Sequence, residues 1–221
     1  MEWTDVTSGV PQGSVLGPLL FLLFINDLGI DIHKSTTVLK FADDTKLFGI
    51  CNNESDYIKL QEDVSKLESW ALAWQMKFKV DKCTVMHIGS GNKKCSYQLG
   101  ISVLESTDIQ KYLRIWKSND LKFEFHTLEA YKKANKMLGM IKRTVVHKDP
   151  RILASLYKSL VRPHLEYCCS AWASHYQKDK DRLEKVQHRF ARILQGMKEL
   201  EYRERLKRLG LWPFEEANLM T

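Results

Sequence analysis

The chain has 221 residues, and 44% of them are hydrophobic, which is enough for one large folded domain or two small ones. The longest apolar run, Leu16 to Ile25, is far shorter than the roughly 20 residues that a membrane span needs, and it contains Gly17 and Pro18. The five cysteines form no CxxC pair, which argues against zinc, and the N-terminus lacks the basic and apolar regions of a secretory signal. We therefore expect an intracellular protein, nuclear or cytoplasmic, that is neither secreted nor bound to a membrane.

The net charge of +7 is unevenly distributed along the chain. Residues 1–110 carry 10 Lys+Arg and 14 Asp+Glu, net −4, whereas residues 111–221 carry 24 and 13, net +11. A basic half is a candidate surface for a polyanion, but ordinary solvated helix faces produce the same pattern. The charge alone does not decide between these interpretations.

The first predicted elements are a turn and an apolar helix. Val10 to Ser14 has the Pro and Gly residues of a turn, and Pro18 suits the first turn of the helix that follows. This helix is apolar nearly all round up to Leu28, so we expect it to be buried centrally.

Short strands and one long helix are expected next. Val38 to Phe48 reads as a β-hairpin around Asp43-Asp44. A helix follows, because apolar residues recur there at spacings of three and four: Tyr57, Leu60, Val64, Leu67, Ala71 and Trp74. Residues 82–88 are rich in β-formers, residues 89–92 read as a turn, and a second hairpin is plausible over residues 97–103.

Beyond about residue 120 the pattern changes to helices. Asp149-Pro150 is expected to cap one of them, and Pro163 is expected to limit or kink it. A further helix follows Asp179, with a buried apolar stripe and a basic remainder that includes Arg182, Lys185, Arg189 and Arg192. The fold class is therefore α+β, with an acidic mixed part at residues 1–105 and a basic helical part at residues 106–221. This division matches a polymerase, in which a small sheet carries metal-binding carboxylates and a helical region grips the duplex.

Ordered motifs make the match specific. The chain resembles the reverse transcriptases of jockey-like non-LTR retrotransposons through the segments Ser8 to Phe21, Ile25-Asn26-Asp27-Leu28, Phe41-Ala42-Asp43-Asp44, Trp74 to Phe78, Val80 to Cys83, Leu156 to Tyr167 and Leu183 to Gln187. The resemblance covers nearly the whole chain. It implies a partial polymerase palm followed by a thumb-like region.

The resemblance also implies roles for single residues. The turn Pro11, Gln12 and Gly13, together with Phe41 and Ala42, is expected beside the incoming nucleotide and the template base. Asp43 is implied as the Mg2+ ligand and Asp44 as its support, in a two-metal reaction that activates the primer 3′-hydroxyl. Lys82 is implied as the proton donor to the pyrophosphate. From the residues alone, the turn and the acidic pair also fit ordinary solvated turns, and Lys82 fits a surface lysine.

The implied partners are an RNA template, a DNA primer and deoxynucleoside triphosphates. Polymerases of this family use a further aspartate from an earlier strand, and we expect this chain to lack both that strand and the fingers. It is therefore expected to be inactive alone unless an N-terminal polymerase part completes the site. The alternative is a non-catalytic nucleic-acid-binding remnant of a mobile element.

Two departures from the family pattern accompany these motifs. Lys79 stands where the family has Asn, three residues before Lys82. Tyr112 and Arg114 replace the acid and the glycine of a family Asp-Leu-Gly, and a side chain at the glycine position is expected to be costly.

Overall fold

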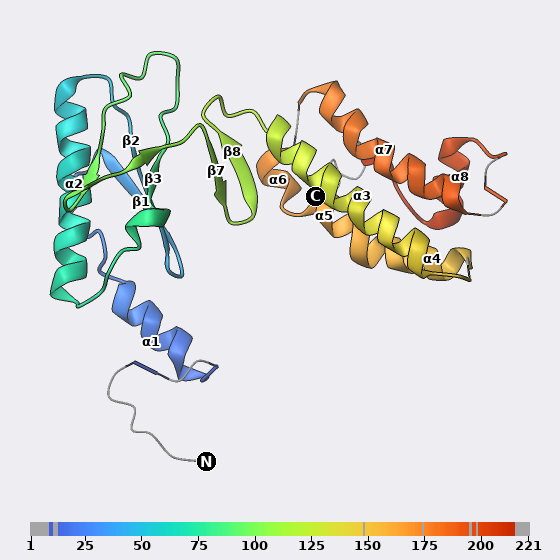
Figure 1. The fold of residues 1–221 in the computed structure, drawn as a ribbon, viewed down its shortest axis with the longest axis horizontal. Coiled ribbons are helices and arrows are strands. Elements are labelled where there is room, and N and C mark those ends of the chain that lie inside the picture. Colours follow the sequence, from blue (N-terminus) through green and yellow to red (C-terminus); the bar gives the residue numbers. More distant parts are fainter. Residues whose placement is uncertain are drawn as a thin grey trace. The chain divides into compact units, whose positions relative to one another are not determined.

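The computed structural model describes residues 9–10, 13–147, 149–173, 175–194, 196–197 and 199–214. The chain divides into two compact units, Met1–Thr107 and Asp108–Thr221 (Figure 1). The first unit mixes helices with short strands, and the second is mainly helical, so the predicted α+β class is confirmed. Throughout these residues, no helix combines the length and the apolar character that crossing a membrane requires.

The first unit is built around one hairpin and one long helix. Its elements are α1 (Leu16–Ile25), β1 (Thr36–Phe41), β2 (Asp44–Gly49), α2 (Glu54–Ala73), a 3-10 turn (Val80–Lys82), β3 (Thr84–Val85), β4 (Gln98–Leu99), β5 (Ser102–Val103) and β6 (Glu105–Ser106). β1 pairs with β2 and β4 with β5, both antiparallel, while β3 pairs in parallel with β6. Both predicted hairpins are thus present. The β-rich stretch after Lys82 yields only the two residues of β3, and its partner strand β6 lies some twenty residues further along the chain.

The helix α2 begins at a well-formed cap and carries the predicted apolar stripe. Asn53 and Asp56 form a capping box, in which each side chain accepts a hydrogen bond from the other residue's backbone N–H. Tyr57, Leu67 and Ala71 are buried along the helix. Part of its polar face contacts β4. The amide of Gln61 exchanges two hydrogen bonds with the backbone of Gln98 on β4, at 2.8 and 2.9 Å.

The helix α1 does not occupy the central buried position that its sequence predicts. Ile25 is its only buried residue in the described structure, and it packs in a small cluster with Leu28 and Leu67. Phe24 makes edge-on ring contacts with Trp70 of α2 and with Trp74, the residue that follows this helix. Five leucines of α1 are between 46% and 68% exposed: Leu16, Leu19, Leu20, Leu22 and Leu23. The apolar character was identified correctly, but within the described residues nothing covers it.

The second unit begins with a hairpin that the sequence did not reveal. Its elements are β7 (Ile109–Tyr112), β8 (Ile115–Ser118), α3 (Glu124–Thr144), α4 (Pro150–Leu156), a π-helical stretch (Tyr157–Val161), α5 (Arg162–Glu166), α6 (Cys169–Trp172), α7 (Gln177–Ile193) and α8 (Tyr202–Leu209). Asp149 caps α4 as predicted, accepting a hydrogen bond from the Arg151 backbone N–H at 2.8 Å. The π-helical stretch ends two residues before Pro163, whose missing N–H interrupts regular helical pairing.

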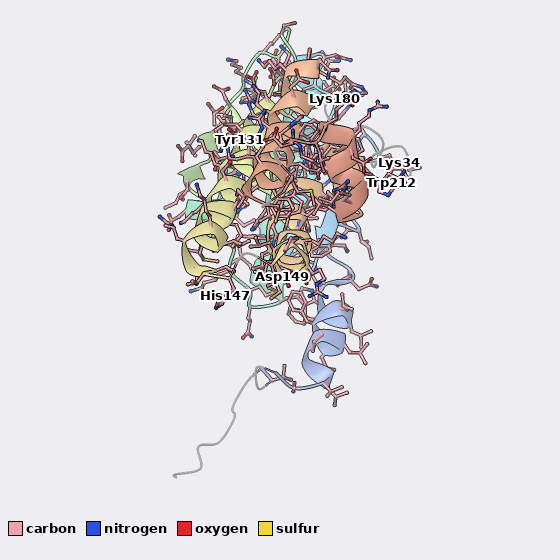
Figure 2. All side chains as sticks on the ribbon, turned by 90° about the vertical axis from the view of Figure 1, so that its right-hand side faces the viewer. Lys34, Tyr131, His147, Asp149, Lys180 and Trp212 are labelled. Carbon is pink, nitrogen blue, oxygen red and sulfur yellow. The ribbon has the colours of Figure 1, made fainter. Side chains whose placement is uncertain are left out.

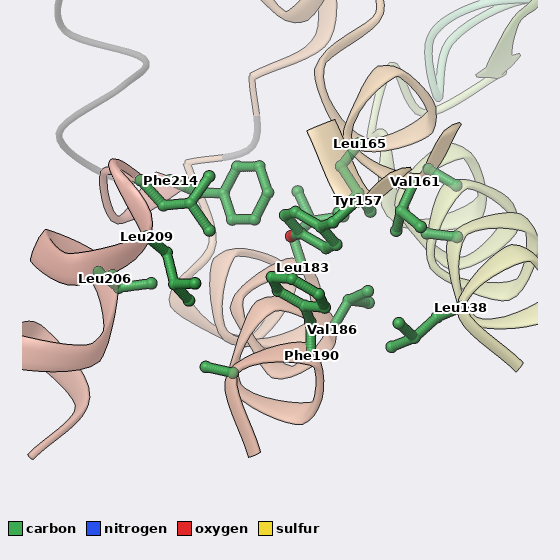
Figure 3. Packing of buried hydrophobic residues seen from close by; sticks show 14 of the residues in the cluster. Leu138, Tyr157, Val161, Leu165, Leu183, Val186, Phe190, Leu206, Leu209 and Phe214 are labelled. Atoms are coloured by element: carbon green, nitrogen blue, oxygen red, sulfur yellow. The ribbon is translucent and has the colours of Figure 1, made fainter. Parts of the chain in front are cut away.

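The core of the second unit lies between α3, the α4–α5 segment, α7, α8 and the chain after α8 (Figure 3). Tyr157 and Phe190 stack face to face with ring centroids 4.1 Å apart, and both side chains are almost fully buried. The Tyr157 hydroxyl donates to Oε1 of the fully buried Gln187 at 3.2 Å. Gln187 Nε2 in turn donates to the Trp212 carbonyl at 3.0 Å, so the buried amide is paired on both sides.

Candidate functional site

The acidic pair lies at the tip of the β1–β2 hairpin. Phe41 pairs with Asp44 across the two strands, so the two-residue turn consists of Ala42 and Asp43, and Asp44 opens β2. Ala42 adopts φ +50, as the first central residue of a type II′ turn does. The turn is one residue earlier than the sequence suggested. Both carboxylates are exposed, and neither makes a hydrogen bond or an ion pair with another described residue.

The hairpin has an open face and a face that contacts the rest of the unit. Because side chains alternate along a strand, Leu39, Phe41 and Phe48 point to the same side of the hairpin. Each of these three side chains is about half exposed. The opposite side carries Thr36, Val38 and Lys40. Phe41 and Asp44 therefore share the open face of the hairpin.

Lys40 joins the hairpin to the end of α1. Its ammonium donates to the carbonyls of Ile25, Asn26 and Leu28 at 3.3, 2.7 and 3.1 Å. These carbonyls belong to the last turn of α1 and the loop after it, where a cation is favoured. The Ile25 carbonyl also accepts a hydrogen bond from the Leu28 backbone N–H at 3.2 Å. The residue just before Phe41 thus fixes the position of the hairpin relative to α1.

A buried carboxylate fixes the segment that leads into β1. Asp63 of α2 is fully buried and accepts from the His33 backbone N–H at 2.9 Å, while His33 Nδ1 and Lys66 Nζ lie 2.8 and 3.0 Å from the same oxygen. Burial alone would raise the pKa of Asp63, but hydrogen bonds from Thr36, His33 and Lys66 hold the pKa below its ordinary value. This carboxylate is therefore committed to structure and is not available to a metal.

The donor chemistry of the tip suits magnesium, but the number of donors is too small. Asp43 and Asp44 offer the hard carboxylate oxygens that Mg2+ prefers. In the part of the chain that the structure describes, no group of three or more His, Cys, Asp or Glu residues is arranged to hold a metal ion. The hairpin is thus suited to contribute ligands to a metal site without forming one by itself.

The structure describes two of the other residues predicted for the active site, Gly13 and Lys82. Pro11 and Gln12 lie outside the described residues, while Gly13 is exposed with φ +89, a conformation that only glycine adopts readily. Lys82 ends the exposed 3-10 turn, and no hydrogen bond or ion pair among the described residues links it to Asp43 or Asp44.

The turn between β7 and β8 explains the cost expected for Arg114. Leu113 and Arg114 adopt φ +46 and +68, so Arg114 stands in a left-handed conformation where the family pattern has glycine. The Leu113 carbonyl accepts a hydrogen bond from the Tyr167 hydroxyl at 3.4 Å, and Ile115 beside the turn is buried. The strain therefore comes from the backbone conformation of the turn.

A stripe of cations runs along α7. Its members are spaced by four, three, four and three residues, which places them on one helical face: Lys178, Arg182, Lys185, Arg189 and Arg192. The helix α3 lies alongside in the same direction, because Glu124 near its start pairs with Lys178, and Asn135 further along pairs with Arg189. Tyr131 of α3, labelled in Figure 2, lines a shallow hollow with Lys178, Asp181, Arg182 and Lys185. We call the five cations Lys178, Arg182, Lys185, Arg189 and Arg192 the α7 stripe.

The two ends of the α7 stripe differ in their partners. Lys178 lies 2.7 Å from the Glu124 carboxylate and Arg182 lies 2.9 Å from Asp179. The hydrogen bond from Lys178 lowers the pKa of the Glu124 carboxyl. By contrast, no described carboxylate forms an ion pair with Lys185, Arg189 or Arg192. The second half of the α7 stripe is therefore the part with uncompensated positive charge.

Sequence reasoning missed Lys40, His33 and Asp63. The contacts of Lys40 could have been predicted, because a lysine on the side of a strand that faces the rest of the unit needs hydrogen-bond acceptors nearby. The same holds for Asp63, since it interrupts the buried side of an otherwise regular helix stripe. No such signal marks the Trp70 indole, which donates to Asp27 Oδ1 at 3.0 Å and ties α2 to the loop after α1.

Comparison with known proteins agrees with the motifs. Residues 2–142 match the family described as "Reverse transcriptase (RNA-dependent DNA polymerase)". The chain is 22% identical over 200 residues to the "Probable RNA-directed DNA polymerase from transposon X-element" of Drosophila melanogaster, covering 87% of this chain and 22% of that protein. It is 24% identical over 208 residues to the "RNA-directed DNA polymerase from mobile element jockey" of Drosophila funebris, covering 86% of this chain and 22% of that protein.

The jockey protein of Drosophila melanogaster gives a similar result, with 24% identity over 175 residues, 73% of this chain and 19% of that protein. The chain thus spans about a fifth of the length of the curated relatives it matches. No solved structure matches it. The resemblance drawn from the ordered motifs is confirmed.

Proposed function

Because the chain belongs to the reverse transcriptase family, we propose that it is part of a retrotransposon RNA-directed DNA polymerase and that its β1–β2 hairpin contributes to the active site. The observation that carries this proposal is the exposed carboxylate pair at the hairpin tip, free of protein partners. In this proposal the first unit is part of the polymerase palm, and the second unit is a thumb-like region that contacts the duplex. The substrates are an RNA template, a DNA primer and deoxynucleoside triphosphates.

Each predicted active-site residue has a proposed role. Asp43 is a magnesium ligand and Asp44 supports it from the first position of β2. Bound magnesium supplies Lewis-acid activation of the primer 3′-hydroxyl and charge stabilisation of the departing pyrophosphate. Phe41 and Ala42 flank the nucleotide, as does the turn Pro11, Gln12 and Gly13. Lys82 donates a proton to the pyrophosphate when substrates bring the two together.

We propose that the chain is inactive alone. Two exposed carboxylates on one hairpin give a divalent cation few protein ligands, and affinity depends on the number and convergence of these ligands. Asp63 cannot contribute, since it is held by His33 and Lys66. A further carboxylate from another polymerase segment has to complete the site.

Primer extension tests this function directly. The chain is assayed with primed RNA, deoxynucleoside triphosphates and Mg2+, alone and with a purified upstream segment of the jockey polymerase. We expect extension only in the mixture, and we expect Asp43→Asn to abolish it while Asp31→Asn, an exposed loop change, does not. Extension by the chain alone that depends on Asp43 contradicts the proposed inactivity. Extension that survives Asp43→Asn contradicts the proposed role of the hairpin.

The α7 stripe favours a second candidate function, which is binding of nucleic acid without chemistry. Successive cations along the stripe are about 5 Å apart along the helix axis, given a rise of about 1.5 Å per residue. Lys185, Arg189 and Arg192 have no carboxylate partners in the described structure, so they are available to phosphates. Arg182 takes part less freely, because Asp179 and Glu124 already hold its guanidinium.

Salt-dependent binding distinguishes this candidate. Affinity for a primer-template duplex is measured by fluorescence anisotropy at several salt concentrations, for the chain and for the triple variant Lys185→Gln, Arg189→Gln, Arg192→Gln. Loss of three phosphate contacts is expected to reduce the slope of log K against log salt by about 2 to 3. The matched control, Arg203→Gln with Lys207→Gln on α8, leaves the slope nearly unchanged. Equal slopes for the triple variant and the chain refute the role of the stripe.

A further inference from the structure

The long helix α2 of the first unit carries a regular row of exposed residues on its outer side (Figure 1). Its members recur at spacings of three and four: Ser55, Ile58, Glu62, Ser65, Ser69 and Leu72. We call these residues the outer α2 face. This spacing places them on one side of the helix, away from the buried Tyr57, Leu67 and Ala71. Two of them are large and apolar, and Ile58 is 54% and Leu72 70% exposed.

A hollow lies in the middle of the outer α2 face. The short side chains of Ser65 and Ser69 lie among longer ones, and together these residues line the hollow: Ile58, Gln61, Glu62, Ser65, Lys66 and Ser69. Two of the long side chains are held in place. The amide of Gln61 is bound to the backbone of β4, and Lys66 Nζ lies 3.0 Å from the buried Asp63 carboxylate. The hollow is therefore preformed.

The serines of the hollow can be covered without leaving a polar group unpaired. The Ser65 hydroxyl donates to the Gln61 carbonyl and the Ser69 hydroxyl donates to the Ser65 carbonyl, both at 3.0 Å. A hydroxyl is costly to bury only when it lacks a hydrogen bond. The hollow therefore suits an aliphatic side chain from another protein surface.

The order of residues along the outer α2 face indicates that this surface belongs to a second copy of the chain. When two α2 helices run antiparallel, each large residue of the face can lie opposite a serine. The three facing pairs are Ile58 with Ser69, Glu62 with Ser65, and Leu72 with Ser55, and two-fold symmetry repeats each of them. Large residues opposite small ones allow close packing between helices. Ile58 of each copy then enters the hollow of the other.

The charges favour the same arrangement. In the antiparallel register, Glu62 of one copy lies next to Lys66 of the other, one residue beyond its facing serine. In a parallel pairing, Glu62 would face its own counterpart, and so would Ser65 and Ser69. Like charges facing each other are unfavourable, and facing serines leave a gap. The outer α2 face is thus complementary to itself in one direction only.

We propose that the chain forms a two-fold symmetric dimer through the outer α2 face, with the two α2 helices antiparallel. This proposal is independent of the proposed polymerase function, because no residue of the face has a role in the candidate active site. The contact spans about 25 Å of one helix from each copy, from Ser55 to Leu72, at about 1.5 Å per residue. Such a small interface gives weak association, with a Kd on the order of tens of micromolar.

Sedimentation equilibrium of the full chain measures this association. The variant Ile58→Ser removes the side chain that enters the hollow, and Ser65→Glu fills the hollow and places a carboxylate opposite Glu62 of the other copy. Each is expected to raise the dimer Kd at least tenfold. Both positions are exposed, so the fold should be retained, and circular dichroism checks this. The matched control Val146→Ser changes an 84% exposed apolar residue of the second unit and should dimerise like the unmodified chain.

Cysteine cross-linking tests the direction of the helices. A chain with Ser55→Cys is mixed with a chain with Leu72→Cys, the mixture is oxidised, and the cross-linked peptides are identified by mass spectrometry. We expect cross-links between position 55 of one chain and position 72 of the other. A chain that stays monomeric well above the expected Kd overturns the proposal, as does a dimer that neither Ile58→Ser nor Ser65→Glu weakens. Cross-links that join position 55 only to position 55 overturn the antiparallel arrangement.

Discussion

Replacing Arg114 with glycine is expected to stabilise the second unit, although glycine usually weakens a folded structure. Arg114 has φ +68 in the β7–β8 turn, and an L-residue in this region costs roughly 1–2 kcal/mol. Its side chain is exposed and makes no hydrogen bond or ion pair with the described residues, so the substitution removes no such contact. Glycine also increases the freedom of the unfolded chain, which offsets about 0.4–1 kcal/mol. The net expectation is a gain of about 0.5–1 kcal/mol.

Urea unfolding followed by tryptophan fluorescence measures this gain. With a slope near 2 kcal/mol/M, the midpoint should rise by roughly 0.3–0.5 M. The matched control is Lys117→Gly in β8, where the backbone is extended and glycine should lower stability by about 0.5–1 kcal/mol. The hydrogen bond from Tyr167 to the Leu113 carbonyl uses the backbone and persists in both variants. A midpoint that falls for Arg114→Gly as it does for Lys117→Gly refutes the argument from strain.

Three further changes probe other parts of the structure. Lys40→Met removes the three hydrogen bonds to the end of α1, so hydrogen exchange at residues 26–30 should accelerate at least several-fold; unchanged exchange would show that Lys40 does not hold α1. Burial lowers the pKa of His126 to about 4, below its ordinary 6.5. As pH falls from 6.5 toward 4, the unfolded chain therefore takes up a proton that the folded chain does not. Stability of the second unit should drop by about 2–3 kcal/mol between pH 7.5 and 4.5, and His126→Asn should flatten this dependence in urea midpoints. Phe190→Ala should cost about 3–5 kcal/mol by removing the ring stacked on Tyr157, whereas the exposed control Val146→Ala should stay within about 0.5 kcal/mol; similar losses in the two variants would contradict the stacking argument.

Local patterns predicted the elements whose signals lie close together in sequence. The β1–β2 hairpin follows from apolar residues on both sides of a turn-prone pair, and α4 follows from Asp149-Pro150. The turn position was off by one residue because Ala42, which is not a typical turn residue, adopts a positive φ. The β7–β8 hairpin was missed for the same reason, since Leu113 and Arg114 carry no turn signal.

Burial was harder to predict, because it depends on what the rest of the molecule provides. The apolar composition of α1 predicts a buried helix, but most of the helix is exposed among the described residues, because composition does not specify which segment covers it. The opposite error applies to Asp63, a carboxylate that is fully buried although the sequence analysis did not predict its burial. Its complete burial depends on His33 and Lys66, and the His33 contact spans a long stretch of sequence.

In the candidate site, too, some features are determined by local sequence and others depend on distant segments. The register of β1 against β2 is set locally, by six cross-strand pairs from Thr36↔Gly49 to Phe41↔Asp44, and it places Asp43 and Asp44 at the tip whether or not a metal can bind there. Metal affinity depends instead on carboxylates that converge from distant segments, and among the described residues none joins this pair. A hairpin can therefore keep the motif of a polymerase without its chemistry. Activity should therefore follow the number of carboxylates that converge on this pair.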